Sequence, residues 1–135
     1  MKARILVIDD DAVACEFLQE VLLREGYDVT AFTSALDALK HDLSPYDLLM
    51  SDIRMPGMDG LQFLSEVQNT WPNLPVILMT AYGSLETTME GIRLGAWDYI
   101  SKPFSPEDCR AMVKKVLEVR ELRQRRQDSP PEAHE

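Results

Sequence analysis

The chain has 135 residues and a mass of 15.4 kDa, and 45% of its residues are hydrophobic. This length predicts one compact domain with a substantial core, and it argues against a two-domain enzyme and against disorder of the whole chain. The 14 basic and 23 acidic residues give a formal net charge of −9, which disfavours binding to nucleic acid or anionic lipid.

Cysteine content and apolar runs exclude further classes of protein. Cys15 and Cys109 lie far apart and belong to no CxxC or Cys/His cluster, so neither a disulfide framework nor a zinc site is expected. The apolar runs, such as residues 5–8, are far shorter than the ~20 residues of a membrane-spanning helix. The first residues lack the apolar stretch of a secretory signal peptide. We therefore expect a cytoplasmic protein that makes no membrane contact.

Five short runs along the chain have strand character. They cover residues 4–8, 27–32, 47–50, 76–79 and 99–100. Most are nearly all apolar, which is typical of strands buried on both faces, and the segments between them are long enough for helices. This alternation predicts an α/β fold with a doubly wound five-stranded parallel sheet.

The segments after the first two strands carry helical signals. In residues 11–25 the apolar side chains are predicted to share one face, before Gly26 supplies a stop. That face comprises Val13, Phe17, Leu18, Val21 and Leu22. A second helix is predicted from Ser34 to just before Pro45. Its inward residues are Leu36, Leu39 and Leu43.

Three more helices are predicted in the second half of the chain. They involve residues 61–67, residues 85–94, and a long segment that begins at Ser105 and Pro106. The last of these continues into an Arg-rich stretch, and the final residues are Pro-rich and acidic. We therefore divide the chain into a domain at 1–122 and a helical extension with a disordered tail or linker at 123–135.

Carboxylates follow two of the predicted strands. Asp9 and Asp10 come directly after the first strand, and Asp52 follows the third. Ligands of doubly wound sheets bind outside the carboxyl ends of the strands, so these side chains are expected to lie together if the two strands are neighbours. A pair of such charges 4 Å apart costs about 4 kcal/mol at an effective dielectric near 20, so the site requires positive charge.

Two sources of positive charge suit this edge. Lys102 follows the fifth strand, and a hard divalent cation such as Mg²⁺ takes oxygen ligands. Together with the hydroxyl of Thr80, which follows the fourth strand, these groups suit a transferred phosphoryl group. Asp52 would then act as the nucleophile.

Four motifs appear in one order and spacing. They are VIDD at 7–10, SDIRMPGMDG at 51–60, MTA at 79–81 and YISKPF at 99–104. Together they resemble the receiver domain of two-component response regulators over about residues 3–122. Residues 81–104 are similar to receivers of enhancer-binding (AAA+) transcriptional activators. The resemblance implies a flavodoxin-like sheet of order 2-1-3-4-5 with helices on both faces.

The resemblance also implies roles at the acidic cluster. Asp52 would accept a phosphoryl group from a phosphohistidine on a sensor histidine kinase or phosphotransfer protein. Asp10, Asp52 and the backbone carbonyl of Arg54 would hold Mg²⁺, with Asp9 acting through water. Arg54 and Tyr82 occupy positions that influence the lifetime of the phosphoryl group in this family. The first helix would belong to the surface that docks the kinase.

Further implied roles concern the switch. Lys102 would pair with phosphoryl oxygens, and the Lys102–Pro103 bond would be cis. Thr80 would donate its hydroxyl to the phosphoryl group, and Tyr99 would turn inward as Thr80 moves.

Ordinary structural roles compete with some of these assignments. Asp11 is interpreted as a helix N-cap, and Asp59 with Gly60 as a turn and helix start. Tyr99 in a short strand is alternatively a core residue. Trp97 is either exposed at a partner surface or partly buried.

Two other functions on related chemistry fit less well. A phosphatase of the haloacid dehalogenase type needs an aspartate two residues after its nucleophile, where this chain has Arg54. A flavin mononucleotide carrier needs a phosphate-cradling loop after the first strand, where the carboxylates of residues 9–11 would repel a phosphate. We therefore expect a signalling phospho-acceptor and not an enzyme.

The output of such a switch is left open by the sequence. The chain is either part of a regulator that controls transcription or a stand-alone receiver in a phosphorelay, with an aspartyl-phosphate phosphatase as the weaker alternative. A homodimer through the fourth and fifth helices is a further hypothesis. Its proposed seam consists of Met112, Val116, Val119 and Leu122.

Overall fold

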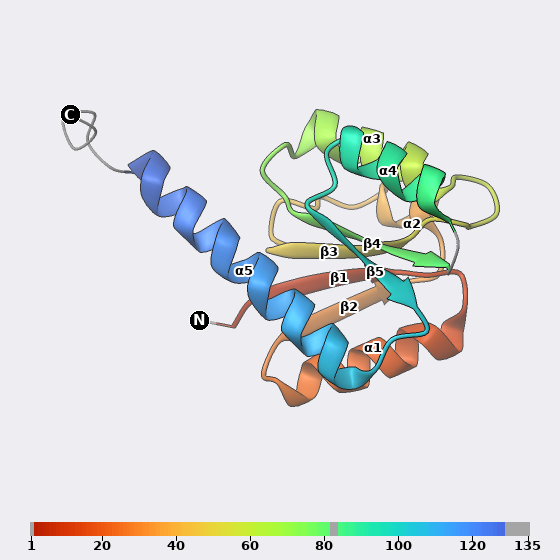
Figure 1. Cartoon of the computed structure of the whole chain (residues 1–135), viewed down its shortest axis with the longest axis horizontal. Helices are drawn as coiled ribbons and strands as arrows, with labels where there is room; N and C mark the ends of the chain where they lie inside the picture. Colours follow the sequence, from red (N-terminus) through yellow and green to blue (C-terminus); the bar gives the residue numbers. More distant parts are fainter. Residues whose placement is uncertain (1, 82–83, 129–135) are drawn as a thin grey trace.

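The computed structural model describes residues 2–81 and 84–128 (Figure 1). Tyr82 and the predicted tail at 129–135 lie outside the described residues. The elements are β1 (Arg4–Ile8), α1 (Ala12–Arg24), β2 (Asp28–Phe32), α2 (Ala35–Ala38), β3 (Leu48–Asp52), α3 (Gly60–Thr70), β4 (Val76–Ala81), α4 (Leu85–Arg93), β5 (Asp98–Lys102) and α5 (Pro106–Asp128).

The strands form one parallel sheet in the order β2-β1-β3-β4-β5, which confirms the predicted fold. Helices α1 and α5 cover one face, and α2, α3 and α4 cover the other (Figure 1). The central strands β1 and β3 are direct neighbours, with Ile8 opposite Ser51. Their carboxyl ends, and the acidic residues that follow, therefore share one edge of the sheet.

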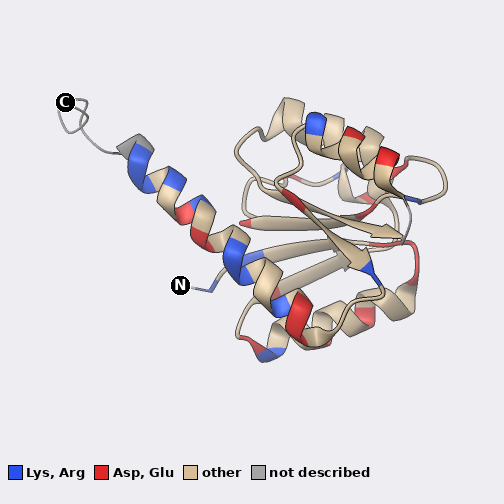
Figure 2. Cartoon of the chain, viewed as in Figure 1, with Lys and Arg blue, Asp and Glu red and all other residues tan. Residues whose placement is uncertain are grey.

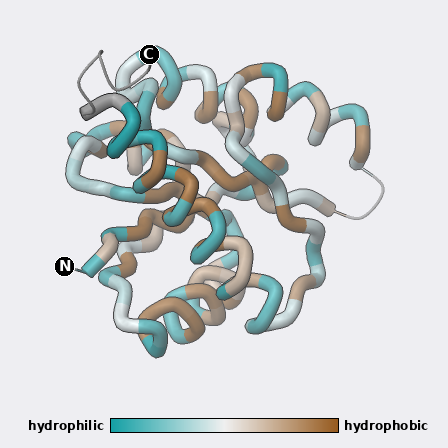
Figure 3. Tube along the Cα trace, turned by 60° about the vertical axis from the view of Figure 1, so that its left-hand side comes forward, coloured by the Kyte–Doolittle hydropathy of each residue, from teal (hydrophilic) through white to brown (hydrophobic). Residues whose placement is uncertain are grey.

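The core consists of two apolar layers, one on each face of the sheet. Successive side chains of a strand point to opposite faces. In β1, Leu6 and Ile8 pack toward α3, whereas Ile5 and Val7 pack toward α1 and α5. Figure 3 shows hydrophobic residues concentrated along the inner segments and hydrophilic ones on the outer turns of the helices. Burial on both faces explains why the central strands are continuous apolar runs.

Side chains before the helices define where most of them begin. The carboxylate of Asp11 accepts the Val13 N–H at 3.0 Å, so its predicted role as an N-cap is confirmed. Asp59 and Gln62 form a reciprocal capping box at the start of α3. By contrast, Ser84 makes no side-chain cap bond at the start of α4.

The second helix is shorter than predicted. It covers only Ala35–Ala38 and does not continue to Pro45. The amides of Lys40 and His41 bond to carbonyls three residues back, which closes the helix into turns. Leu36, predicted inward, is 51% exposed because the single helical turn buries its two alanines instead.

Val13 is also misplaced by the sequence prediction, since it is 71% exposed. The buried stripe of α1 consists of Cys15, Leu18, Val21 and Leu22. At 3.6 residues per turn, Val13 lies about 140° around the helix from Leu18, which puts it on the solvent side.

Helix α5 begins at Pro106 as predicted and continues through the Arg-rich stretch to Asp128, projecting from the body in Figure 1. Figure 2 shows basic residues along this extension. Val113 and Val116 are buried against the sheet, whereas Leu122 is 60% exposed. In the part of the chain that the structure describes, no helix is long and apolar enough to cross a membrane.

The two cysteines are expected to resist thiol reagents. Both are buried, and burial raises the pKa of Cys109 to about 11. At pH 8 the thiolate form of such a thiol is about one part in a thousand. Titration with a chromogenic disulfide should therefore show slow reaction in native buffer and rapid reaction of both thiols in urea. Rapid native labelling of Cys109, located by peptide mapping, would contradict this prediction.

Candidate functional site

Three carboxylates meet at the carboxyl edge of the sheet. Asp9 follows β1 and is fully buried, Asp52 ends β3 with its side chain 15% exposed, and Asp10 is exposed. One oxygen of each lies within 4.8 Å of the others. The adjacency of β1 and β3 brings them together, as the predicted strand order requires.

Lys102 is the positive group of this cluster. It ends β5, and its Nζ lies 2.6 Å from Asp9 Oδ2 and 3.5 Å from Asp52 Oδ2. The Lys102–Pro103 peptide bond is cis, as the resemblance implied. Asp9 also accepts the Asp11 N–H through its other oxygen at 3.0 Å. The lysine therefore contacts the buried Asp9 more closely than it contacts Asp52.

The ionisation of the cluster shows that negative charge is in excess. Burial raises the pKa of Asp52, and the negative charge of Asp9 adds to this, although Lys102 acts in the opposite direction. Burial acts to lower the pKa of Lys102, but its hydrogen bond to Asp9 and the charge of Asp52 outweigh this and raise the pKa. Three carboxylates with one ammonium provide hard oxygen ligands for a divalent cation, so the residues present fit Mg²⁺.

Gly60 allows the start of α3 to approach the backbone of Asp52. Its N–H donates to the Ile53 carbonyl at 2.7 Å. A Cβ at this position would lie 2.3 Å from the Asp52 carbonyl oxygen and 2.6 Å from Ile53 Cα. From the sequence, Gly60 was interpreted only as an ordinary helix start. Its position directly after the capping Asp59 was the only signal of this close approach.

A small hollow of about 180 Å³ opens beside Asp52. Its lining residues are Asp52, Ile53, Arg54, Ala81, Ser84, Thr87 and Lys102. The hydroxyl residues Ser84 and Thr87, at the start of α4, were missed by sequence reasoning because they do not follow a strand directly. Thr80, which was predicted to face a phosphoryl group, is 3% exposed and is not among the residues that line this hollow.

A larger and mainly apolar opening of about 470 Å³ lies beside Asp9 and Lys102. It is lined by Asp9, Asp11, Ala14, Phe17, Leu18, Ala81, Lys102, Pro103 and Phe104. The rings of Phe17 and Phe104 are tilted against each other with centroids 6.2 Å apart. This opening places an apolar surface of α1 next to the charged cluster.

The two aromatic residues of the β5 region lie in different environments. The Tyr99 side chain is at the surface, with the residue 44% exposed. Trp97 packs partly against the α1 and α5 side of the core, so partial burial is the correct alternative for this residue. Exposed apolar residues of α4, including Leu85 and Met89, lie on the other side of the same sheet edge.

The fold and the site together define a class of protein. It is a doubly wound α/β domain with an acidic cluster and a lysine at the carboxyl edge of its sheet. The family model of the response regulator receiver domain matches residues 5–114. The chain belongs to this family, and it is a receiver domain of two-component response regulators.

Curated relatives agree with this assignment. The chain is 39% identical over 117 residues to the DNA-binding transcriptional regulator NtrC of Proteus hauseri, covering 86% of the chain and 25% of that protein. It is 41% identical over 117 residues to the response regulator protein FleR of Pseudomonas aeruginosa, covering 86% of the chain and 24% of that protein. The chain thus spans about a quarter of the length of these curated relatives.

Solved structures are similar in fold. NtrX from Brucella abortus superposes with a TM-score of 0.88 at 32% identity, covering 95% of this chain and 29% of that one. A CheY-like receiver domain protein from Methanospirillum hungatei gives a TM-score of 0.84 at 30% identity, covering 91% of this chain and 99% of that one. The predicted flavodoxin-like receiver fold is therefore confirmed.

Proposed function

We propose that this domain is a switch in which Asp52 accepts a phosphoryl group from a phosphohistidine on a sensor histidine kinase or phosphotransfer protein. A carboxylate oxygen of Asp52 attacks phosphorus, the phosphorus–nitrogen bond breaks, and its electron pair remains on the donor imidazole. The observation that carries this proposal is the placement of Asp52 in a small hollow, 3.5 Å from Lys102 and beside two further carboxylates.

The surrounding residues have distinct proposed tasks. Asp10, Asp52 and the backbone carbonyl of Arg54 would hold Mg²⁺, with Asp9 through water, and the ion would supply positive charge against the phosphoryl oxygens. Lys102 moves from Asp9 toward the new phosphoryl oxygens, which are strong acceptors.

The switch itself is proposed to involve Thr80 and Tyr99. Thr80 donates its hydroxyl to the phosphoryl group, and Tyr99 leaves the surface as that hydroxyl moves. Such a change requires that the phosphoryl group interact more favourably with one arrangement than with the other. Thr80 and Tyr99 lie on the adjacent strands β4 and β5, which supports this coupling.

Partners are proposed from the exposed surfaces. The apolar opening lined by Phe17 and Phe104 supports kinase docking at α1. For a homodimer through α4 and α5, Val116 of the predicted seam is 3% exposed, so the pairing surface would consist of the exposed residues nearby. These are Leu85, Met89, Tyr99 and Leu122.

The wider role is inferred from the relatives. Because NtrC of Proteus hauseri is described as a DNA-binding transcriptional regulator, we infer that this domain controls transcription through an output segment to which residues 123–135 lead. A stand-alone receiver in a phosphorelay is the alternative, and a phosphatase is disfavoured by Arg54. The domain would act in the cytoplasm as a phospho-acceptor and not as an enzyme, with neither nucleic acid nor membrane bound by this segment.

Intact mass spectrometry tests the proposal. After incubation with a small-molecule phosphoryl donor and Mg²⁺, the chain should gain one phosphoryl group, and peptide mapping should place it on Asp52. Chelation of the metal should abolish the gain, because the carboxylate cluster then lacks the charge that offsets its repulsion. A gain on another residue, or an equal gain after chelation, would contradict the proposed site.

A further inference from the structure

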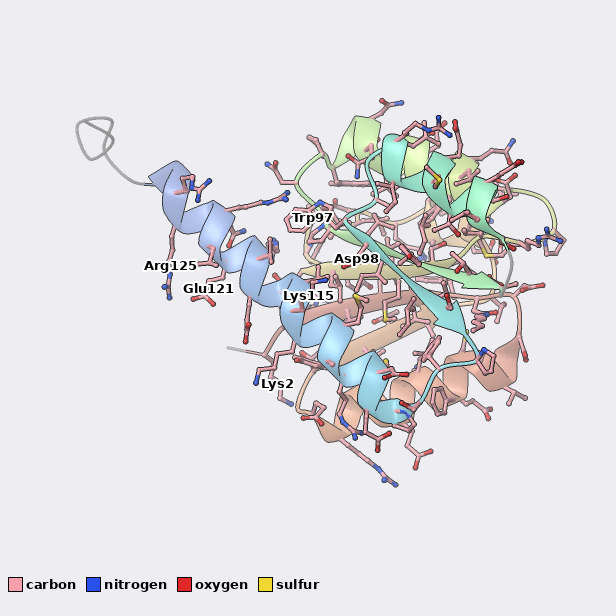
Figure 4. The ribbon with its side chains drawn as sticks, viewed as in Figure 1. Lys2, Trp97, Asp98, Lys115, Glu121 and Arg125 are labelled. Atoms are coloured by element: carbon pink, nitrogen blue, oxygen red, sulfur yellow. The ribbon has the colours of Figure 1, made fainter. Side chains whose placement is uncertain are left out.

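Two arginines of α5 contact the amino end of the sheet, at the opposite end of the strands from Asp52. Arg120 Nη1 lies 2.5 Å from Asp47 Oδ1, and the guanidinium carbon of Arg123 lies 4.1 Å from the centroid of the Trp97 ring. Asp47 directly precedes β3, and Trp97 directly precedes β5. Figure 4 shows Trp97 beside α5. We refer to Arg120, Arg123, Asp47 and Trp97 as the arginine clamp.

The arginine clamp is partly shielded from water. The side chains of Arg120 and Asp47 are 22% and 31% exposed, and the Arg120 Nε is buried. Asp47 is itself held in place, because its other carboxylate oxygen accepts the Arg4 N–H at 2.7 Å. Partly desolvated ion pairs and a guanidinium stacked on tryptophan are stronger than ordinary surface ion pairs. These contacts therefore hold the part of α5 that extends past the sheet.

Strand β5 connects the arginine clamp to the acidic cluster. Lys102 ends this strand and contacts Asp9 and Asp52, whereas Trp97 comes directly before its first residue. Between them, the carboxylate of Asp98 accepts hydrogen bonds from Lys115 of α5 at 2.8 Å and from the Tyr99 N–H at 2.8 Å. One short strand thus contacts the site at one end and α5 at the other.

We propose that the arginine clamp fixes the direction in which α5 leaves the domain, and that β5 couples this contact to the phosphorylation state of Asp52. The second half of this inference rests on the proposed function. A phosphoryl group on Asp52 changes the partner of Lys102, and any resulting shift of β5 changes the position of the Trp97 ring relative to Arg123. Coupling of this kind is reciprocal, so loss of the clamp uncouples α5 from the site.

Hydrogen exchange of residues 119–128 tests the clamp itself. The double variant Arg120→Ala/Arg123→Ala should exchange about fivefold faster per lost contact than the parent. Alanine is the better helix former, so loss of intrinsic helix propensity does not explain faster exchange. Arg126→Ala, which removes an exposed arginine of the same helix, is the matched control and should leave exchange unchanged. Equal protection in the double variant and the parent would overturn the clamp.

The coupling is tested by repeating the measurement with a phosphoryl donor and Mg²⁺, while intact mass reports phosphorylation. Exchange in residues 119–128 should change by at least about twofold in the parent and stay constant in the double variant. A phosphorylated parent without this change would overturn the coupling alone. A chain that gains no phosphoryl group would contradict the proposed function and the coupling with it, and the first measurement would still decide the clamp.

Discussion

Asp52→Asn is expected to abolish the gain of a phosphoryl group from a small-molecule donor, as measured by intact mass. The amide that replaces the carboxylate offers no anionic oxygen to attack phosphorus, and it removes one ligand from the acidic cluster. Asp28→Asn is the matched control, because this exposed carboxylate lies at the start of β2, at the other end of the sheet. It should be phosphorylated like the parent. Full phosphorylation of Asp52→Asn would show that another residue is the acceptor.

The same variant is expected to be more stable than the parent at neutral pH without Mg²⁺. Folding raises the pKa of Asp52, mainly by burial, so the folded chain holds this proton more tightly than the unfolded chain. The favourable contribution of the protonated carboxyl is complete below the ordinary value of 3.8 and is lost as pH rises through the raised pKa.

Thermal unfolding as a function of pH measures this effect. Asp52→Asn should unfold a few degrees above the parent at pH 7, and the difference should disappear in acid. A difference that persists unchanged below the ordinary carboxyl pKa would show that the gain does not come from ionisation of Asp52.

Gly60→Ala is expected to lower the free energy of unfolding by about 3 kcal/mol, because an added Cβ overlaps backbone atoms that no side-chain rotation can move. The overlap is with the Asp52 carbonyl oxygen at 2.3 Å and with Ile53 Cα at 2.6 Å. Relief requires that α3 move away from the end of β3. That movement displaces the backbone that carries Asp52 and Arg54, so phosphorylation of the folded fraction should slow by on the order of 100-fold.

Gly26→Ala separates overlap from backbone strain. Gly26 has a φ of +88°, and no atom lies within 4 Å of the place that an added methyl group would occupy, so alanine there costs only conformational strain of about 1–2 kcal/mol. Urea unfolding and the initial rate of mass gain should show this variant mildly destabilised and normally phosphorylated. A Gly60→Ala variant with the parent's stability and rate would show that α3 does not position Asp52.

The sheet and its acidic edge were predictable because their causes are local. Strands buried on both faces must be apolar along their whole length, which marks the central strands in the sequence. Parallel strands that are neighbours end at one edge, so Asp9, Asp10 and Asp52 follow from strand order. The start of α1 was predictable for the same reason, since Asp11 caps the helix through a bond within its own turn.

Features that depend on long-range packing were predicted less well. Leu36 and Val13 were placed inward, yet a helix face is defined by what it packs against, and both side chains are exposed. Ser84 and Thr87 line the hollow beside Asp52 only because α4 packs there. No local pattern in the sequence marks such positions.

The sequence by itself determined the family, the strand order through its motifs, and the identity of the carboxylates and lysine at the site, because these depend on residue type and on spacing along the chain. Only the tertiary structure decided that Lys102 contacts Asp9 more closely than Asp52, and that Arg123 stacks on Trp97. Each of these contacts joins residues far apart in the chain. Their geometry is set by how the helices pack on the sheet, and periodicity along the sequence carries no record of it.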